Sequence, residues 1–478
     1  MKLKSIMIIA LIIILSIVTA CGNNDSSNNT DETSQTTNDT QATTEESDTA
    51  TEQASDVPTK PITLTYATFI GDGDKDMMGI VIKEFTKLYP NITFETQIFD
   101  HESYQEKLSI MSKSNTLPDL FWWNANAIVD AFTANQSIAD LTAYIDDEFS
   151  AAMSQAALVN LTTPDGKVVG FPAENQVQAW LHNKALFDQY GVKIPETPDE
   201  LKAAVKVFKE NGIATIAQGT KDPWPTWGVQ DWLVKHGIFD NAEKVFGTGE
   251  MKFSESPAAQ VYTFIGELAA LGAFPENNST MTYEQSAALF TSGKAAMISI
   301  PSDQLAKVVG TPVEPDTSYT WGIKFPDQPF DQNRVPGGVT NGYAVSANAA
   351  SDPDKMAAIV ALNKFRFTEQ GFKLSLKAGA NLPATVQADL SEFGKIVQDQ
   401  AKLIGDPNAN IDLTAAYSYY HVWDKNWESY GSKFHTVDSA LMNALIDGSK
   451  KTADIPAELA KIDKVIADVI KQWQADKK

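Results

Sequence analysis

Tryptophan and tyrosine residues beside polar residues are the feature of this 478-residue sequence best suited to chemistry at a site. Ten tryptophans are present, and several stand in turn-rich segments rather than at the spacing of a core-facing helix or strand. A flat indole stacks on the C–H face of a pyranose ring, while neighbouring polar side chains bind its hydroxyls. The pattern therefore favours a carbohydrate site, with candidates Trp122, Trp123, Asn124, Trp224, Trp227, Tyr420 and Trp423, whereas Trp180, Trp232 and Trp427 are assigned to the core.

Motifs for metal, nucleotide or nucleophilic chemistry do not occur in the sequence. The five histidines, at 101, 182, 236, 421 and 435, have no pair at the spacing of a helical metal site. The chain also lacks a GxGxxG fingerprint, a GxxxxGK[ST] loop and a GxSxG elbow. We therefore expect no catalytic residue, no metal site and no cofactor.

Three alternating aspartates, Asp72, Asp74 and Asp76, resemble the start of a calcium-binding loop. Met77 occupies the position that such a loop needs as glycine, and Lys83 the position of its bidentate glutamate. We interpret the segment instead as a solvated loop with a carboxylate that caps the following helix.

Glycoside hydrolysis is the alternative from another functional class, because it needs only two carboxylates at a suitable separation. With 61 acidic residues, the chain offers many candidates. No single Asp or Glu stands in an apolar, aromatic setting that would mark a raised pKa as clearly as an acid catalyst requires. A surface glycosidase or polysaccharide-degrading enzyme therefore remains the rival hypothesis.

The N-terminus predicts export and anchoring. Lys2 and Lys4 precede an apolar run over residues 6–18, as in a signal peptide covering residues 1–20. Cys21, the sole cysteine, follows Val18-Thr19-Ala20 and resembles the lipobox of bacterial lipoproteins, which implies a diacylglycerol on its sulfur. Residues 21–60 are polar and predict a disordered tether. We expect a protein anchored by lipid on the outer face of a cell membrane, on the extracellular side of a Gram-positive bacterium.

Length and charge limit the fold and the partners. Residues 61–478 exceed one ordinary hydrophobic core and suit two lobes. The net charge of −23 and the absence of clustered Lys and Arg argue against a nucleic-acid partner. Strand and helix patterns alternate, which predicts an α/β fold with mainly parallel sheets. The segments that carry this prediction are strands at 62–66, 92–98, 120–123, 213–217 and 295–300, and helices at 78–89, 104–113, 198–210, 282–292 and from 351 onward.

The order of these landmarks resembles the family 1 extracellular solute-binding proteins of bacterial ABC importers, the group that includes maltose-binding protein. The resemblance extends over residues 61–478. The segments that carry it are Leu88–Ile92, Leu117–Leu120, Gly166–Pro172, Leu181–Phe187, Pro195–Leu201, Phe290–Met297, and Gly337-Gly338 leading into Tyr343–Ser346.

This resemblance implies a two-lobe periplasmic-binding-protein-like fold of type II, with ligand bound in a cleft between the lobes. Lobe 1 would comprise residues 61–172 and about 340–382, and lobe 2 residues 173–339 and about 383–478. The chain would cross between them after Pro172, near 338–342 and near 381–383. Glu174, Asn175, Gly337 and Gly338 would then lie at the cleft floor. Where relatives often have Gly-x-Trp, this chain has Pro301-Ser302-Asp303, so Asp303 would bind a hydroxyl or cap a helix.

The sequence thus predicts a non-enzymatic receptor that binds a carbohydrate, most simply an oligosaccharide, and delivers it to the transmembrane subunits of an ABC permease. We expect it to be monomeric. A non-sugar solute on the same scaffold is a further alternative. A polyamine would need several cleft carboxylates, and a phosphate would need arginine, of which the chain has only Arg334 and Arg366.

Overall fold

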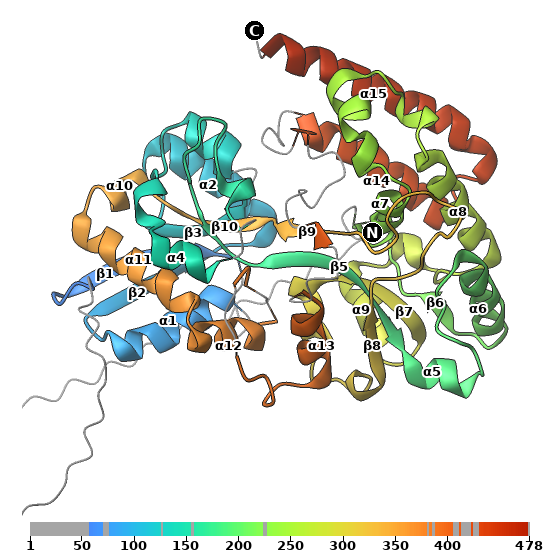
Figure 1. Ribbon diagram of the computed structural model, residues 1–478, viewed down its shortest axis with the longest axis horizontal. Helices are drawn as coiled ribbons and strands as arrows, with labels where there is room; N and C mark the ends of the chain where they lie inside the picture. Colours follow the sequence, from blue (N-terminus) through green and yellow to red (C-terminus); the bar gives the residue numbers. More distant parts are fainter. Residues whose placement is uncertain are drawn as a thin grey trace, which may run out of the picture. The chain divides into compact units, whose positions relative to one another are not determined.

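The computed structural model describes residues 57–69, 76–125, 128–153, 157–222, 227–379, 382–384, 388–404, 411–412, 422–423 and 430–476. The predicted signal peptide, Cys21 and most of the predicted tether lie outside these residues. These described residues belong to one compact unit that contains two β-sheets with flanking helices (Figure 1). The predicted two-sheet α/β fold is therefore confirmed.

The first sheet has the strand order β2-β1-β3-β10-β4. Its strands are β1 (Ile62–Thr68), β2 (Ile92–Ile98), β3 (Leu120–Asn124), β4 (Phe171–Pro172) and β10 (Asn341–Val345). β1 runs parallel to β2 and β3, whereas β10 runs antiparallel to β3 and β4. The alternation of apolar residues in β1 buries Leu64 and Tyr66 completely.

The second sheet has the order β11-β9-β5-β7-β6, and β8 also pairs with β5. Its strands are β5 (Asn175–Asn183), β6 (Ala214–Ile216), β7 (Ala295–Pro301), β8 (Thr317–Thr320), β9 (Val335–Val339) and β11 (Ile411–Asp412). β5 is antiparallel to β7, β8 and β9. Both sheets are thus mixed rather than mainly parallel, because strands that return from the other sheet enter in the opposite direction.

Helices flank both sheets (Figure 1). α1 and α11 pack against the first sheet, and α6, α7, α9 and α13 against the second. The helices are α1 (Met77–Leu88), α2 (His101–Ser114), α4 (Asp147–Ala152), α5 (Lys184–Gln189), α6 (Pro198–Glu210), α7 (Trp227–Lys235), α8 (Ala258–Leu271), α9 (Tyr283–Thr291), α10 (Ala347–Ala350), α11 (Pro353–Arg366), α12 (Glu369–Lys377), α13 (Lys395–Ile404), α14 (Ser432–Ile446) and α15 (Ile455–Asp476). In the described part of the chain, none of them is both long and apolar enough to cross a bilayer.

Side-chain caps fix the starts of the helices that the sequence predicted most directly. Thr197 accepts a hydrogen bond from the backbone N–H of Glu200 and begins α6 at Pro198, as predicted. Thr282 and Gln285 form a reciprocal capping box that begins α9. Both helices therefore start where local chemistry satisfies the free N–H groups of their first turns.

Trp180 and Trp232 lie in the hydrophobic core, as predicted. Each indole is only 1% exposed, and the two rings stack with centroids 5.6 Å apart at an interplanar angle of 2°. Their burial removes two of the ten tryptophans from the set that could contact a ligand.

The folded body begins earlier than residue 61. The side-chain amide of Asn91 donates hydrogen bonds to the backbone carbonyls of Pro58 and Lys60, and Val57 packs against the core. The last four residues of the predicted tether are therefore part of the folded unit.

The chain passes from the first sheet to the second at Ala173–Glu174, between β4 and β5, and returns at Thr340, between β9 and β10. The two passages are bonded to each other, because the N–H of Ala173 donates to the carbonyl of Asn341 at 3.0 Å. The predicted third crossing includes Asn381, which lies outside the described residues. The lobe boundaries drawn from the sequence accordingly stay a prediction.

Candidate functional site

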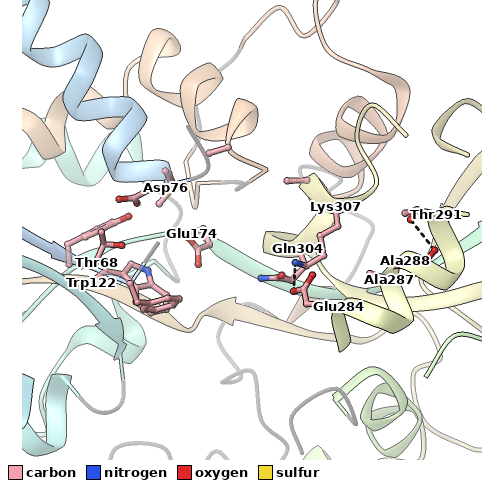
Figure 2. Close-up of a pocket in the computed structure, with 15 residues that line it drawn as sticks. Thr68, Asp76, Trp122, Glu174, Glu284, Ala287, Ala288, Thr291, Gln304 and Lys307 are labelled. Carbon is pink, nitrogen blue, oxygen red and sulfur yellow. Dashed lines mark hydrogen bonds and ion pairs between the residues drawn. The ribbon is translucent and has the colours of Figure 1, made fainter. Parts of the chain in front are cut away.

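A cleft of about 620 Å³ lies between elements of the two sheets. Such a volume falls in the roughly 300–1,000 Å³ range of sites for small molecules. Figure 2 shows Asp76, Trp122 and Glu174 on one side, and Glu284, Gln304 and Lys307 on the other. The lining residues are Thr68, Phe69, Asp76, Met77, Trp122, Glu174, Glu284, Ala287, Ala288, Thr291, Gln304, Ala306, Lys307, Tyr343 and Ala378.

The aromatic wall of the cleft comes from the carboxyl ends of β1 and β3. These parallel strands bring Thr68 and Trp122 to the same edge of the first sheet. Phe69 follows β1, and its ring meets the Trp122 indole edge-on, with centroids 5.2 Å apart at 72°. The half-buried Trp122 thus lines the cleft and is held there by its T-shaped contact with Phe69.

Asp76 lies beside this wall at the start of α1. Its Oδ1 accepts hydrogen bonds from the hydroxyl of Tyr66 at 3.1 Å and from the N–H of Met78 at 3.2 Å. The carboxyl group caps the helix, as predicted, but the residue is only 4% exposed rather than solvated. Burial raises the pKa of Asp76 to about 6, and the hydrogen bond from Tyr66 offsets part of that rise.

The second carboxyl group of this wall belongs to Glu174, in the first passage between the sheets. Its Oε1 accepts a hydrogen bond from the side-chain amide of Asn341, in the second passage, at 2.9 Å. The guanidinium of Arg366 donates to the carbonyl of Ala173 at 2.7 Å and packs on the ring of Tyr343, 4.6 Å from its centroid. A buried cation therefore stands behind the carboxylate of Glu174.

The opposite wall is built from α9 and the short 3-10 helix Ser302–Lys307. The ammonium of Lys307 lies 2.6 Å from Oε1 of Glu284, and the two side chains are 26% and 71% exposed. Gln304 adds a side chain that can both donate and accept hydrogen bonds. This wall is therefore polar, and its lysine is paired with a carboxylate.

The structure brings two of the predicted site residues, Trp122 and Glu174, to the described cleft. Trp123 and Asn124 continue β3 but do not line it, and Trp123 packs against Tyr104. Asn175 is buried at the start of β5, where its backbone carbonyl accepts a hydrogen bond from Ser302.

Gly337 and Gly338 lie within β9, paired with Val177 and Gln176 of β5, rather than on the cleft wall. The backbone of Gly338 has a φ of 144°, which a side chain would strain. These glycines serve strand pairing near the second passage.

Trp423 differs from the prediction. It is fully buried and packs edge-on against Phe246 and Phe434, with centroids 5.2 and 6.3 Å away. Polar neighbours in the sequence indicated a ligand contact, but α14 covers the indole. Trp224 and Tyr420 lie outside the described residues, as do the side chains of Trp227 and Asp303.

Several lining residues were not predicted. Thr68 and Phe69 follow directly after a parallel strand, a position where ligands commonly bind in α/β folds, and this signal could have identified them. The aromatic setting of Asp76 could not be seen in sequence, because Tyr66, Trp122 and Tyr343 come from three separate strands. The expectation that no acidic residue has an apolar, aromatic environment was therefore wrong for Asp76.

Residues 71–362 match the model of the family described as bacterial extracellular solute-binding protein. The chain belongs to that family. The resemblance seen in the sequence is thereby confirmed. This solute-binding protein is also similar in structure to a chitin oligosaccharide binding protein, with a TM-score of 0.68 and 19% identity over 86% of this chain and 100% of the other.

Two curated relatives show different solutes in their names. The melibiose/raffinose/stachyose-binding protein MelE of Bacillus subtilis (strain 168) is 23% identical over 34% of this chain and 37% of its own length. The sn-glycerol-3-phosphate-binding periplasmic protein UgpB of Rhizobium meliloti (strain 1021) is 27% identical over 37% of this chain and 41% of its own. The chain thus spans less than half the length of both relatives.

The raised pKa of Asp76 predicts an unusual pH dependence of stability. Between the unfolded value near 3.8 and the folded value of about 6, the folded protein holds a proton that the unfolded chain has lost. Stability from this group is therefore greatest below about pH 3.8, falls as pH rises from there through about 6 by up to about 3 kcal/mol, and is level above that. Asp76→Asn keeps a side-chain oxygen that can cap the helix but cannot ionise. The variant should therefore have a higher free energy of unfolding than the wild type between pH 5 and pH 8, as measured by urea unfolding.

Asp146→Asn is the matched control, because Asp146 also caps a helix, α4, but is exposed, and hydrogen bonding to Lys364 lowers its pKa. The Asp146 carboxylate is ionised in both the folded and the unfolded state from pH 5 to pH 8. Its substitution should therefore leave the pH dependence of the free energy of unfolding unchanged. Parallel curves for the wild type and Asp76→Asn would contradict the account of Asp76.

Proposed function

We propose that this protein is a lipid-anchored extracellular receptor that binds a carbohydrate, most simply an oligosaccharide, and delivers it to an ABC permease. The observation that carries the proposal is the cleft itself. It combines an indole surface with buried carboxyl groups on one side and, facing them, polar side chains from α9 and the 3-10 helix Ser302–Lys307. A ligand that contacts both walls of the cleft would favour a closed state in which the walls lie nearer to each other.

The chemistry of the cleft suits a sugar. Trp122 and Phe69 offer aromatic surface for the apolar face of a pyranose, and Asp76 and Glu174 offer carboxyl oxygens for its hydroxyls. Both acids are fixed by neighbouring donors, Tyr66 and Asn341, so little side-chain entropy is lost when a ligand binds.

Charge argues against an anionic solute. Of the described residues that line the cleft, three are acidic and one, Lys307, is a cation, and that cation is paired with Glu284. A phosphate would need a free Lys or Arg, and it would be repelled by Asp76 and Glu174. The names of MelE and the chitin oligosaccharide binding protein support a neutral oligosaccharide, in preference to the glycerol phosphate in the name of UgpB.

Glycoside hydrolysis is the second candidate function, and Asp76 is the observation that favours it. A carboxyl group whose burial raises its pKa to about 6 has the property of a general acid. The family relationship supports binding without turnover. We accordingly propose that the protein is not an enzyme and that Asp76 serves recognition.

Isothermal titration calorimetry distinguishes a sugar receptor from a receptor for an anionic solute, and a test for product distinguishes both from a glycosidase. The solutes to titrate are raffinose, stachyose, chitotriose and sn-glycerol 3-phosphate. We expect saturable binding of at least one oligosaccharide, no binding of glycerol phosphate and no product after prolonged incubation. Trp122→Ala should weaken the sugar by about 10- to 100-fold, because stacking surface is lost.

Trp423→Phe is the control, since Trp423 is buried away from the cleft in the core around Phe246 and Phe434. It should reduce stability and leave sugar affinity unchanged. Tight binding of glycerol phosphate, or cleavage of a glycan that Asp76→Asn abolishes, would refute the proposed function.

We further propose that Cys21 carries the anchor and that the protein acts as a monomer on the outer face of a Gram-positive membrane. Two lysines, an apolar run and the small residues before Cys21 support the anchor at that cysteine. Metabolic labelling with palmitate should mark the wild type in the membrane fraction, and Cys21→Ser should lose the label. A Cys21→Ser protein that still carries palmitate would contradict the assignment.

A further inference from the structure

The ladder between β1 and β3 stops just before the cleft. The register of β1 with β3 ends at the pair Ala67 and Phe121, and the residues that follow in each strand, Thr68 and Trp122, both line the cleft. On its other side β3 stays paired with β10, through Trp122 and Tyr343. The aromatic wall therefore lies at the end of the β1–β3 ladder.

Tyr104, from α2, occupies this position. Its hydroxyl oxygen lies 3.0 Å from the carbonyl oxygen of Ala67 and 2.9 Å from that of Trp122, and the residue is fully buried. Carbonyls are acceptors only, so the single hydroxyl proton is shared between the two strands. The hydroxyl thereby bridges β1 and β3 beside the cleft.

The ring of Tyr104 supports the same wall. Its centroid lies 5.5 Å from that of Phe69, 5.8 Å from that of Phe99 and 5.4 Å from that of Trp123. Phe69 in turn contacts the Trp122 indole. Tyr104 therefore holds both aromatic residues of the cleft. Its ring packs on the ring of Phe69, and its hydroxyl bonds the backbone carbonyl of Trp122.

We propose that Tyr104, which does not line the cleft, is a positioning residue that sets the orientation of the Trp122 indole and the Phe69 ring for a ligand. The effect on affinity rests on the proposed sugar-binding function, whereas the effect on the indole does not. Burial raises the pKa of Tyr104 far above its ordinary value, so the hydroxyl keeps its proton throughout the physiological range.

Tyr104→Phe in the full chain tests the proposal, because it keeps the ring and removes the hydroxyl. Without sugar, the contribution of Trp122 to the near-ultraviolet circular dichroism and emission spectra is obtained as the difference between each protein and its Trp122→Phe version. We expect Tyr104→Phe to change this difference spectrum. An unchanged spectrum would overturn the proposal, whether or not any sugar binds.

Raffinose titration supplies the second measurement. Tyr104→Phe should weaken raffinose by about 5- to 10-fold, the effect of losing one buried hydrogen bond. In a Trp122→Ala background, Tyr104→Phe should weaken raffinose binding by less than about 2-fold, because Tyr104 acts on affinity through the Trp122 indole. Equal losses in both backgrounds would contradict positioning. If raffinose fails to bind the wild type, the spectral measurement alone decides the role of Tyr104.

Tyr262→Phe is the control. Tyr262 is also a buried tyrosine, and its hydroxyl bonds Asp438 in the hydrophobic core that contains Trp180 and Trp232. It should lower the melting temperature without altering the Trp122 spectrum. Should Tyr104→Phe fail to fold, Phe99→Leu loosens the ring of Tyr104 from its other side and should change the same spectrum. An unchanged spectrum in Phe99→Leu would then count against the proposal.

Discussion

The connection between the two sheets depends on a short contact between two chain passages. The N–H of Ala173 donates to the carbonyl of Asn341, and the amide of Asn341 donates back to Glu174. The hydroxyl of Thr340 bonds the side chain of Gln176 one step further along. Since these bonds join residues more than 160 positions apart in sequence, the two passages form one bonded ribbon rather than two independent links.

This ribbon also contributes to the cleft. Glu174 is both a lining residue and the acceptor of the bond from Asn341, and Arg366 holds the adjacent carbonyl of Ala173 from behind. A ligand hydroxyl at Glu174 would therefore act on the same residue that joins the passages. In the proposed receptor, this ribbon would link recognition at the cleft to closure of the sheets on the solute.

Local chemistry allowed much of the fold to be predicted. The starts of α6 and α9 follow from Thr197 and Thr282, whose caps act within four residues. The mixed direction of the sheets was missed, since the partners of β5 and β10 come from distant segments. Trp122 was found because an aromatic residue beside polar residues is visible in the sequence, and Glu174 because it follows a landmark of the family. The burial of Asp76 and of Trp423 was missed, because the residues that cover each come from other elements.

The central claim is that a sugar closes the two sheets around itself, and an interlobe distance measurement tests it most directly. The described residues contain no cysteine, so labels can be placed at Lys113→Cys in α2 and Lys206→Cys in α6, both exposed, once Cys21 is replaced by Ser. Double electron–electron resonance should show a shorter distance when the oligosaccharide that binds most tightly in calorimetry is added. A saturated complex with the same distance distribution as the free protein would contradict the account.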